Sequence, residues 1–345
     1  MKPRYLFPTD YMADPAAHVF NGRLYIYPSH DRQCDNVFDD DGGHFQMRDY
    51  HVLSLDDVEQ GAVTDHGVIL DMDQVNWVEK QMWDSDVVEN HGNYYLVFSA
   101  KDYNGEFRLG VAVAPRPEGP FTPQEHPIRA AYGIDPCLFK DDDGRIYCYY
   151  GGLWGGQLQW HMPLNVNPLQ LPDTAPAPDG HADIGHAPDK RTQLYAPAGT
   201  AALPSFVARM TDDVLQFTEA PRPVVILGDD KQPLTADNPH RFFEASWMHK
   251  YNGKYYFSYS TGDSHLLCYA TGDSPYGPFT YQGILLDPVV GWTTHHSIVQ
   301  YRGQWYLFYH DCVPSAGVTH LRSLKVQRLY YREDGTIEKV ENPLP

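Results

Sequence analysis

The chain has 345 residues, enough for one large domain or two ordinary ones, and 42% of them are apolar. Its formal net charge of −19 argues against nucleic acids and anionic membranes as partners, because such surfaces attract lysine and arginine. The sequence contains no apolar run approaching about 18 residues, so we expect no membrane span and a ligand that is neutral or cationic.

The N-terminal segment MKPRYLFPTDYMADP lacks the apolar core of a signal peptide. We therefore expect a cytoplasmic protein, or a secreted one if a leader has been removed. The five cysteines are scattered without a CxxC pair. This pattern indicates buried small apolar residues and neither a disulfide framework nor a zinc site.

Five segments repeat one pattern: glycine, any residue, an apolar or aromatic residue, tyrosine, and then further strand-forming residues. They are GRLYIY at 22–27, GNYYLVF at 92–98, GRIYCYY at 144–150, GKYYFSY at 253–259 and GQWYLFY at 303–309. A second apolar run precedes each glycine, so each segment predicts a β-hairpin with a tight turn at the glycine.

The hairpin glycines stand at positions 22, 92, 144, 253 and 303. Intervals of this size are typical of four-stranded propeller blades, so we predict an all-β, five-bladed β-propeller. The similar segments EGPFTP at 118–123 and YGPFTY at 276–281 fall where outer strands of two blades are expected. The alternative is an ordinary β-sandwich with repeated Gly-Tyr turns.

The longest interval holds residues 163–200, which are rich in proline, alanine, aspartate and histidine. The hairpin pattern resumes afterwards, so this stretch predicts a long loop insertion and not a domain linker. We expect residues 1–345 to form a single catalytic propeller domain.

Four ionisable residues hold similar positions ahead of the hairpin glycines. They are Asp14, Asp135, Glu244 and His295, each eight or nine residues before its glycine. In a propeller the first strand of each blade lines the axis, so these side chains are expected to meet at one end of the channel. Any one of these acids alone could be a turn or cap residue.

Two carboxyl groups facing one pocket suit glycoside hydrolysis, in which one is protonated and the other ionised. Phe242, Phe243 and Trp247 surround Glu244 in the sequence, and apolar neighbours raise a carboxyl pKa, which favours the acid role there. Asp14 and Asp135 each precede a proline, which restricts the local backbone and aims the side chain.

Nearly the whole chain resembles glycoside hydrolase family 43, five-bladed propeller enzymes that remove arabinose or xylose from plant polysaccharides. The resemblance rests on ADPAAHVFNGRLYIYPSHD, GIDPCLFKDDDGRIYCYYGG, FFEASWMHKYNGKYYFSYS, TTHHSIVQYRGQWYLFYHD and LRSLKVQRLYYREDGTI. It implies an inverting enzyme with Asp14 as general base, Glu244 as general acid and Asp135 as an ionised residue that orients the acid and tunes its pKa. It also implies that Arg322 reaches the sugar.

The same resemblance places His295 on the propeller axis, near a calcium ion or a water. We therefore expect no required cofactor, and a structural Ca²⁺ at His295 as an option beside a hydrogen-bonded histidine. The segment HADIGHAP at 181–188 lacks ligand geometry, and we do not predict a metal there.

The chain departs from the family pattern at three places. The acid is followed by Ala245-Ser246 where Gly-Pro is common, Gln327 replaces a closing-strand acid, and MWDSDVV introduces two further acids. We interpret Asp86 as structural and leave the role of Asp84 open. His30 and Asp31 follow the first hairpin and are interpreted as structural.

Trp83, Trp154 and Trp292 stand near strand starts or loops, where each could bind a sugar face or belong to the core. The expected activity is removal of terminal α-L-arabinofuranosyl or β-D-xylosyl residues from hemicellulose- or pectin-derived oligosaccharides. The expected partner is a neutral oligosaccharide or polysaccharide. An endo-arabinanase and a non-catalytic carbohydrate-binding propeller remain alternatives.

Overall fold

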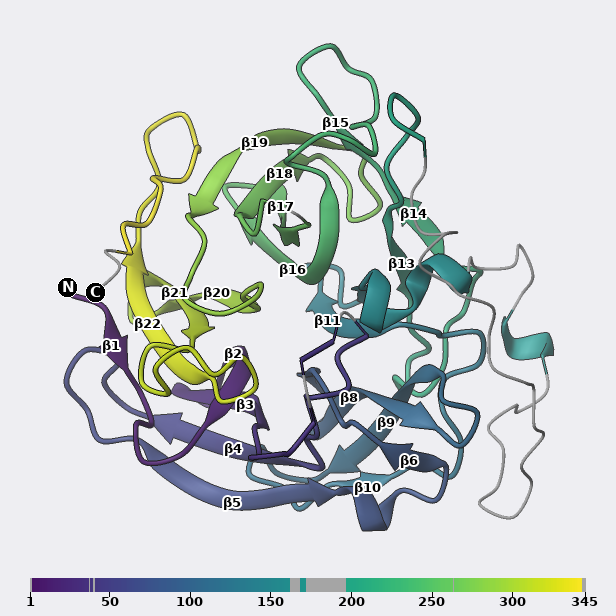
Figure 1. Cartoon of the computed structure of the whole chain (residues 1–345), viewed down its shortest axis with the longest axis vertical. Coiled ribbons are helices and arrows are strands. Elements are labelled where there is room, and N and C mark those ends of the chain that lie inside the picture. The colour runs from purple at the N-terminus through teal and green to yellow at the C-terminus, as the bar shows by residue number, and fades with distance from the viewer. Residues whose placement is uncertain are drawn as a thin grey trace.

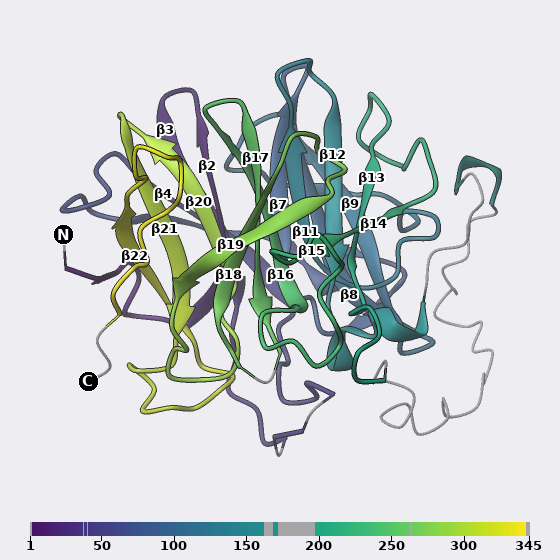
Figure 2. The ribbon, with the colours of Figure 1, turned by 90° about the horizontal axis from the view of Figure 1, so that it is seen from above.

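The computed structural model describes residues 2–36, 38–39, 41–161, 168–171, 197–262 and 264–342. Within these ranges the chain forms five β-sheets arranged in a ring, each sheet following the last in chain order (Figure 1). The prediction of an all-β, five-bladed propeller is confirmed. Seen from the edge of the ring, the strands form a layer with loops at both faces (Figure 2).

The elements have the following bounds. Blade 1 contains β2 (Met12–Phe20), β3 (Arg23–His30), β4 (Asp49–Leu55) and β5 (Thr64–Asp71). Blade 2 contains β6 (Val78–Lys80), β7 (Ser85–Asn90), β8 (Asn93–Asp102), β9 (Phe107–Ala114) and β10 (Thr122–Pro123). Blade 3 contains β11 (Ile134–Lys140), β12 (Ile146–Gly151), β13 (Ser205–Arg209) and β14 (Arg222–Val224). Blade 4 contains β15 (Ile226–Leu227), β16 (Phe242–Tyr251), β17 (Lys254–Thr261), β18 (Leu267–Gly272) and β19 (Phe279–Leu286). Blade 5 contains β20 (His296–Tyr301), β21 (Gln304–Asp311), β22 (Ser323–Leu329) and β1 (Arg4–Tyr5). Short 3-10 helices are η1 (Met72–Gln74), η2 (Trp154–Gly156), η3 (Leu158–Trp160) and η4 (Pro168–Gln170).

Each predicted hairpin is present, one in each blade. The hairpins are β2–β3, β7–β8, β11–β12, β16–β17 and β20–β21. In four of them a two-residue turn has both residues at positive φ, as at Asn21 (52°) and Gly22 (77°). This is the turn geometry that matches the right-handed twist of the flanking strands. The third hairpin has a longer acidic turn, in which only Gly144 takes positive φ (82°).

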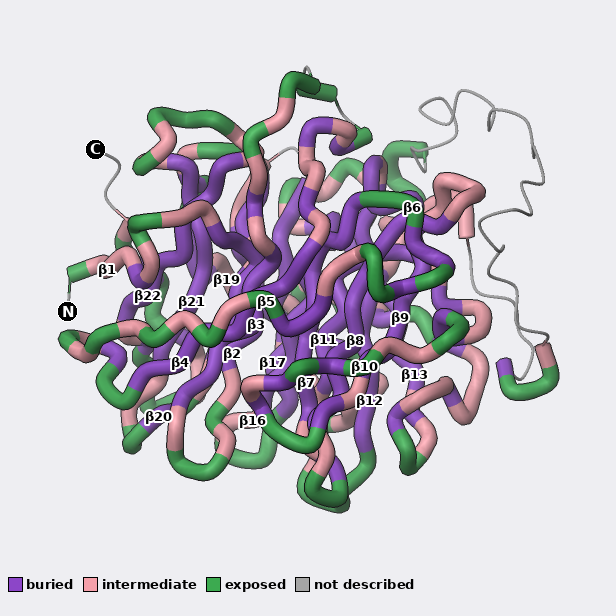
Figure 3. Tube along the Cα trace, turned by 90° about the horizontal axis from the view of Figure 1, so that it is seen from below, coloured by how far each residue is buried: buried purple, intermediate pink, exposed green. Residues whose placement is uncertain are grey.

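The first strand of each hairpin faces the axis of the ring. Neighbouring inner strands are in contact around the ring: β2 with β7, β7 with β11, β11 with β16, β16 with β20, and β20 with β2. These strands are buried at their starts, whereas the first five residues of the outer strand β5 alternate between exposed and partly buried (Figure 3). The starts of the inner strands therefore all open toward one end of the channel.

The N-terminal strand β1 closes the ring by pairing with β22, the last strand of the chain. The Tyr5 hydroxyl donates to Asp311 Oδ1 over 2.8 Å, and Arg4 Nη1 donates to the Val58 carbonyl oxygen over 2.9 Å. Residues from both ends of the sequence thus complete one sheet.

The five cysteines are free and four of them are buried, as expected. The loop insertion expected at 163–200 lies largely outside the described residues. No helix within the described ranges has the length and apolar character that crossing a bilayer requires.

Candidate active site

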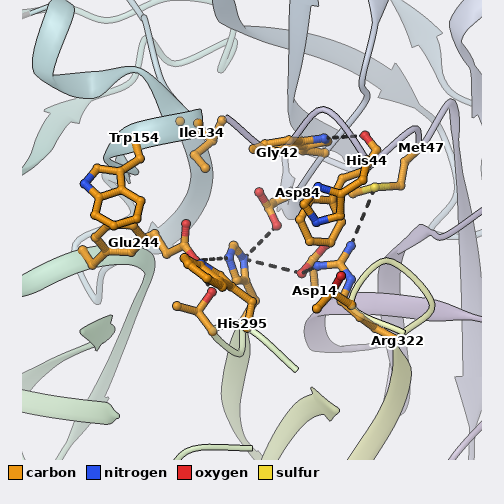
Figure 4. A pocket seen from close by; sticks show the side chains of 18 of the residues that line it. Asp14, Gly42, His44, Met47, Asp84, Ile134, Trp154, Glu244, His295 and Arg322 are labelled. Carbon is orange, nitrogen blue, oxygen red and sulfur yellow. Dashed lines mark hydrogen bonds and ion pairs between the residues drawn. The ribbon is translucent and has the colours of Figure 1, made fainter. Parts of the chain in front are cut away.

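The predicted residues converge in one pocket at the end of the channel where the inner strands begin (Figure 4). Asp14 lies in β2 and Glu244 in β16, and His295 immediately precedes β20. Asp135 of β11 lies beside His295, slightly deeper along the axis. Blade 2 contributes Asp84, whose role the sequence left open.

A β-bulge at the same place in three inner strands aims these side chains. The pairing register shifts between Ala13 and Ala16, between Ile134 and Cys137, and between Glu244 and Trp247. Within these bulges Asp14 and Asp135 take positive φ, 52° and 58°, which is uncommon for residues other than glycine. Such strained backbone is typical of functional sites.

The third bulge corrects one detail of the repeat. The residue at positive φ in β16 is Ala245 (63°), so Ala245, and not Glu244, occupies the position of Asp14 and Asp135. Glu244 stands one residue earlier. The Ala-Ser departure noted in the sequence therefore falls inside the bulge itself.

His295 lies between the carboxylates. Its Nδ1 atom is 2.7 Å from Asp84 Oδ1 and 3.7 Å from Asp14 Oδ1, while Nε2 is 3.7 Å from Asp135 Oδ2 and 3.8 Å from Glu244 Oε1. Burial alone would lower the pKa of His295, but Asp135, Asp84 and Asp14 outweigh it and raise the pKa well above its usual value. The ring thus favours the imidazolium form.

Asp84 and Asp135 form a coupled pair. Burial raises the pKa of Asp135 well above its usual value, and the charge of Asp84 adds to this effect. Burial acts on Asp84 in the same direction, but His295 and a hydrogen bond from Asp135 outweigh it and lower the pKa of Asp84. The surroundings thus raise the pKa of Asp135 and lower that of Asp84, and the ionised state expected for Asp135 stays a prediction.

Asp14 is held by a cation and a hydroxyl. Arg322 Nη1 donates to Asp14 Oδ1 over 2.8 Å, and Ser29 Oγ donates to Oδ2. Arg322 also donates to Asp31 through Nε (2.9 Å) and Nη2 (2.7 Å). Burial raises the pKa of Asp14 to about 7, and Arg322 limits the rise.

Glu244 is fixed from two sides. The Thr293 hydroxyl donates to Glu244 Oε1, and the backbone N–H of Ala245 donates to Asp135 Oδ2 over 2.6 Å. The second contact ties the bulge that carries the acid to Asp135. Glu244 Oε2 has no such fixed donor among the described hydrogen bonds.

Loops from several blades wall the pocket, which encloses about 660 Å³ of space, part of it open to solvent. The loop between β3 and β4 contributes a group of mostly aromatic and polar residues: Phe38, Asp39, Gly42, His44, Phe45 and Met47. Gly42 lies against Trp83 at φ 71°, and a Cβ there would come within 2.5 Å of the indole ring. This loop and Trp83 therefore form one tightly fitted wall.

The three predicted tryptophans all line the pocket, in different settings. Trp83 is nearly buried, packs on Phe107 at 4.4 Å between ring centroids, and donates from Nε1 to the Phe45 carbonyl oxygen. Trp154 and Trp292 are partly exposed, with ring centroids 6.2 Å apart. Both also pack on other rings, Trp154 on Phe243 and Trp292 on Phe38, so they form an aromatic part of the pocket lining.

The groups around His295 could hold a cation if His295 were neutral and Asp135 ionised. Asp135 Oδ1 is buried without a hydrogen-bond partner among the described residues, and Nε2 of His295 lies beyond hydrogen-bond length from its two carboxylate neighbours. Asp135, Glu244 and His295 can each offer one ligand atom within 4.8 Å of one another. Carboxylate oxygens are the ligands that Ca²⁺ prefers.

Sequence reasoning missed several polar contributors to the site, among them Asp31 and Thr293. Asp31 was interpreted as structural, but its two oxygens orient Arg322. The sequence did contain a clue: Asp31 directly follows the end of β3, and this strand runs back toward the pocket. Thr293 stands two residues before His295 and carried no signal in the repeat.

Other acids and histidines have structural roles, as predicted. Asp86 contacts His18 Nε2 over 2.5 Å and accepts the Leu138 backbone N–H over 2.6 Å. His30 Nδ1 lies 2.6 Å from Asp49 Oδ1. These two residues are the last of β3 and the first of β4, so their contact joins the two ends of the β3–β4 loop. Gln327 donates to the Tyr309 hydroxyl, away from the pocket. The segment 181–188 lies outside the described residues.

Comparison with known proteins identifies the family. The sequence model described as Glycosyl hydrolases family 43 matches residues 13–184 and 204–337. A β-xylosidase of Xylanibacter ruminicola is 61% identical over 343 residues, which cover 99% of this chain and 100% of that protein. The solved structure of RS223 β-xylosidase is 55% identical with a TM-score of 0.87, covering 98% of each chain.

A second solved structure is a family 43 β-xylosidase/α-arabinofuranosidase from a compost microbial metagenome, in complex with xylotriose in a calcium-free form. It is 48% identical with a TM-score of 0.88, covering 99% of this chain and 97% of that one. The five-bladed fold, the convergence of Asp14, Asp135 and Glu244, and these matches over nearly the whole length agree: the chain belongs to glycosyl hydrolase family 43.

Proposed function

We propose that this glycoside hydrolase removes terminal β-D-xylosyl residues from short xylo-oligosaccharides by a single, inverting displacement. One observation carries the proposal: the carboxylates of Asp14 and Glu244 face the same pocket from opposite nitrogens of His295 (Figure 4). Two carboxyl groups separated in this way leave room for a water on one side of a sugar and a leaving oxygen on the other.

Asp14 is the general base. Arg322 and Ser29 fix its two oxygens, and its pKa of about 7 suits proton abstraction near neutral pH. The carboxylate removes a proton from water as the water oxygen attacks the anomeric carbon. The C–O bond to the leaving sugar breaks in the same step.

Glu244 is the general acid that protonates the departing oxygen. Thr293 occupies Oε1, so Oε2 is the oxygen that carries the proton toward the substrate. Asp135 acts on the acid through the Ala245 N–H, which donates to Asp135 Oδ2. In this arrangement Asp135 orients Glu244.

The shape of the pocket supports action on chain ends. Described residues of the β3–β4 loop, from Phe38 to Met47, close one side, Trp154 to Gly156 another, and Trp292 and Thr319 the remaining rim. A walled pocket accepts one terminal sugar more readily than the middle of a polymer, which disfavours the endo-arabinanase alternative. The names of the two solved relatives, and the xylotriose bound to one of them, support xylose as the terminal sugar.

Terminal α-L-arabinofuranosyl residues are a second candidate substrate. One solved relative is named as a β-xylosidase/α-arabinofuranosidase, and both sugars are pentoses with several hydroxyl groups. The non-catalytic alternative is disfavoured because base, acid and orienting residue are all present and hydrogen-bonded.

A calcium ion near His295 is part of the proposal: Asp135 and Glu244 oxygens would hold it directly or through water, and its charge would require a neutral His295 and an ionised Asp135. Such an ion would supply positive charge on the propeller axis. Calcium titration of protein treated with a chelator, followed by thermal unfolding, tests this point: a midpoint that rises with Ca²⁺ supports it, and an unchanged midpoint contradicts it.

Hydrolysis of xylobiose and of nitrophenyl β-D-xyloside and α-L-arabinofuranoside tests the function. Proton NMR of the first product formed should show xylose with inverted anomeric configuration. Absence of hydrolysis of all three substrates, with xylose binding retained, would support the carbohydrate-binding alternative.

A further inference from the structure

Two buried residues, Thr293 and His310, connect the acid side of the pocket to its base side. The Thr293 hydroxyl donates to Glu244 Oε1, and the carbonyl oxygen of the same residue lies 3.3 Å from Nε2 of His310. The other ring nitrogen of His310, Nδ1, lies 3.1 Å from the backbone nitrogen of Asp14. Three hydrogen bonds thus run from Glu244 to Asp14.

The partners of His310 define its tautomer. The backbone N–H of Asp14 can only donate, so Nδ1 must accept, and the ring proton resides on Nε2. The Thr293 carbonyl can only accept, which suits an Nε2–H donor. His310 is 1% exposed, and burial lowers its pKa well below the usual value, in keeping with a neutral ring.

The β-bulge explains why Asp14 needs this partner. The register shift between Ala13 and Ala16 takes the Asp14 N–H out of the ladder with β3. A buried N–H without an acceptor is costly, and His310 at the end of β21 supplies one. The ring therefore holds the backbone at positive φ from which the Asp14 carboxylate is aimed.

We infer that Thr293 and His310 are positioning residues that hold the acid and the base at a fixed separation through this hydrogen-bonded path. The inference rests on the proposed roles of Glu244 and Asp14. Thr293 fixes the acid, His310 fixes the base, and the Nε2–H bond to the Thr293 carbonyl joins the two.

The dependence of kcat on the leaving group distinguishes a defect at the acid, Glu244, from a defect at the base, Asp14. Xylobiose needs a proton on its departing oxygen, whereas dinitrophenyl β-D-xyloside releases a stable anion without one. We expect Thr293→Val to reduce kcat on xylobiose by roughly 10- to 100-fold and on the dinitrophenyl substrate by less than about threefold, because only acid catalysis is misaligned. Thr293→Ser restores the hydroxyl and should recover most of the lost rate.

Two amide substitutions divide the roles of His310. His310→Asn keeps an acceptor where Nδ1 stood but loses the donor to Thr293, so it should show the leaving-group signature of Thr293→Val. His310→Gln keeps a donor near the position of Nε2 but loses the acceptor for Asp14, so it should slow both substrates alike. Thr293→Val combined with His310→Asn should be no slower than either variant alone, because both break one path.

Thr294→Val is the matched control. Thr294 is also buried, and among the described residues its hydroxyl hydrogen-bonds to backbone atoms of His310 and His295 and to no catalytic side chain, so its loss should lower thermal stability without a leaving-group signature. Glu244→Gln supplies the reference signature, and its near-native activity would overturn the proposed function itself. If Glu244→Gln shows the signature and folded Thr293→Val and His310→Asn do not, the inference alone is overturned.

Discussion

Arg322 donates a hydrogen bond from Nη1 to Oδ1 of Asp14 over 2.8 Å, although 308 positions separate the two residues in the chain. Both side chains are buried, and the same guanidinium serves Asp31. One cation therefore balances two buried carboxylates, and the state of the general base depends on the closing blade.

Replacement of Asp14 by asparagine is expected to remove the general base. Turnover should fall by roughly 10²- to 10⁴-fold on both xylobiose and activated aryl xylosides, because water must be deprotonated with either leaving group. Steady-state kinetics with xylose binding as a control for folding checks this prediction. Near-native turnover in Asp14→Asn would rule out the assigned role.

Replacement of Glu244 by glutamine should give a different pattern. We expect a loss of roughly 10²- to 10⁴-fold on xylobiose and a much smaller loss on dinitrophenyl xyloside, which leaves without protonation. A plot of log kcat against leaving-group pKa should be steep for the variant and shallow for the wild type. Equal slopes would contradict the role of Glu244 as acid.

The raised pKa of Asp14, about 7, predicts an acidic limb in the pH profile. The ionised form is the base, so kcat/KM should fall tenfold per pH unit below about 7. The effect on stability has the opposite sign. Asp14 takes up a proton at a higher pH in the folded state than in the unfolded chain. Its contribution to the free energy of unfolding therefore increases as pH falls from about 7 toward 4.

Unfolding of wild type and Asp14→Asn by urea across this pH range measures that effect. The difference in unfolding free energy, wild type minus Asp14→Asn, should increase as pH falls, by at most about 1.4 kcal/mol per pH unit. A wild-type advantage that shrinks as pH falls would show that the pKa of Asp14 is lowered and not raised.

Arg322→Met should destabilise the fold by about 3–5 kcal/mol, because it leaves Asp14 and Asp31 buried without their cation. The double variant Asp31→Asn/Arg322→Met removes one of the stranded charges and should recover part of this loss. Denaturant unfolding of wild type, single and double variants checks both statements. A double variant less stable than Arg322→Met would contradict the charge argument.

Deletion of residues 1–6 should destabilise blade 5. It removes β1, the hydrogen bond from the Tyr5 hydroxyl to Asp311, and the Arg4 contact with Val58. We expect a lower midpoint of thermal unfolding and faster proteolysis within β20–β22. Tyr5→Phe, which loses one hydrogen bond and keeps the strand, should cost only about 1 kcal/mol.

The blades could be predicted from sequence because each hairpin is encoded locally. Glycine at a positive-φ turn, flanked by apolar runs, recurs five times, and the structure has a hairpin at each position. The repeated GPFT segments also lie at outer strands, β10 and β19, as expected. Local turn residues and the apolar runs beside them were therefore sufficient to predict the hairpins and the number of blades.

The site was only partly predictable because its details are non-local. The position of Glu244 relative to the bulge, the pairing of Asp31 with Arg322 and the contact of Thr293 with Glu244 all depend on how separate blades meet. The raised pKa of Asp135 is similar: it follows from burial and from the charge of Asp84 in a neighbouring blade, which no count along one strand reveals.

The closing strand β1 ends at Tyr5, and the chain then enters β2, whose third residue is Asp14. The segment that seals the ring is thus also the segment that leads into the catalytic base. We expect detachment of the N-terminal strand to loosen this segment, and with it the alignment of the base, before the core unfolds. Catalytic rate is therefore a sensitive gauge of ring closure, and it should decline on heating before the spectroscopic signals of the sheets do.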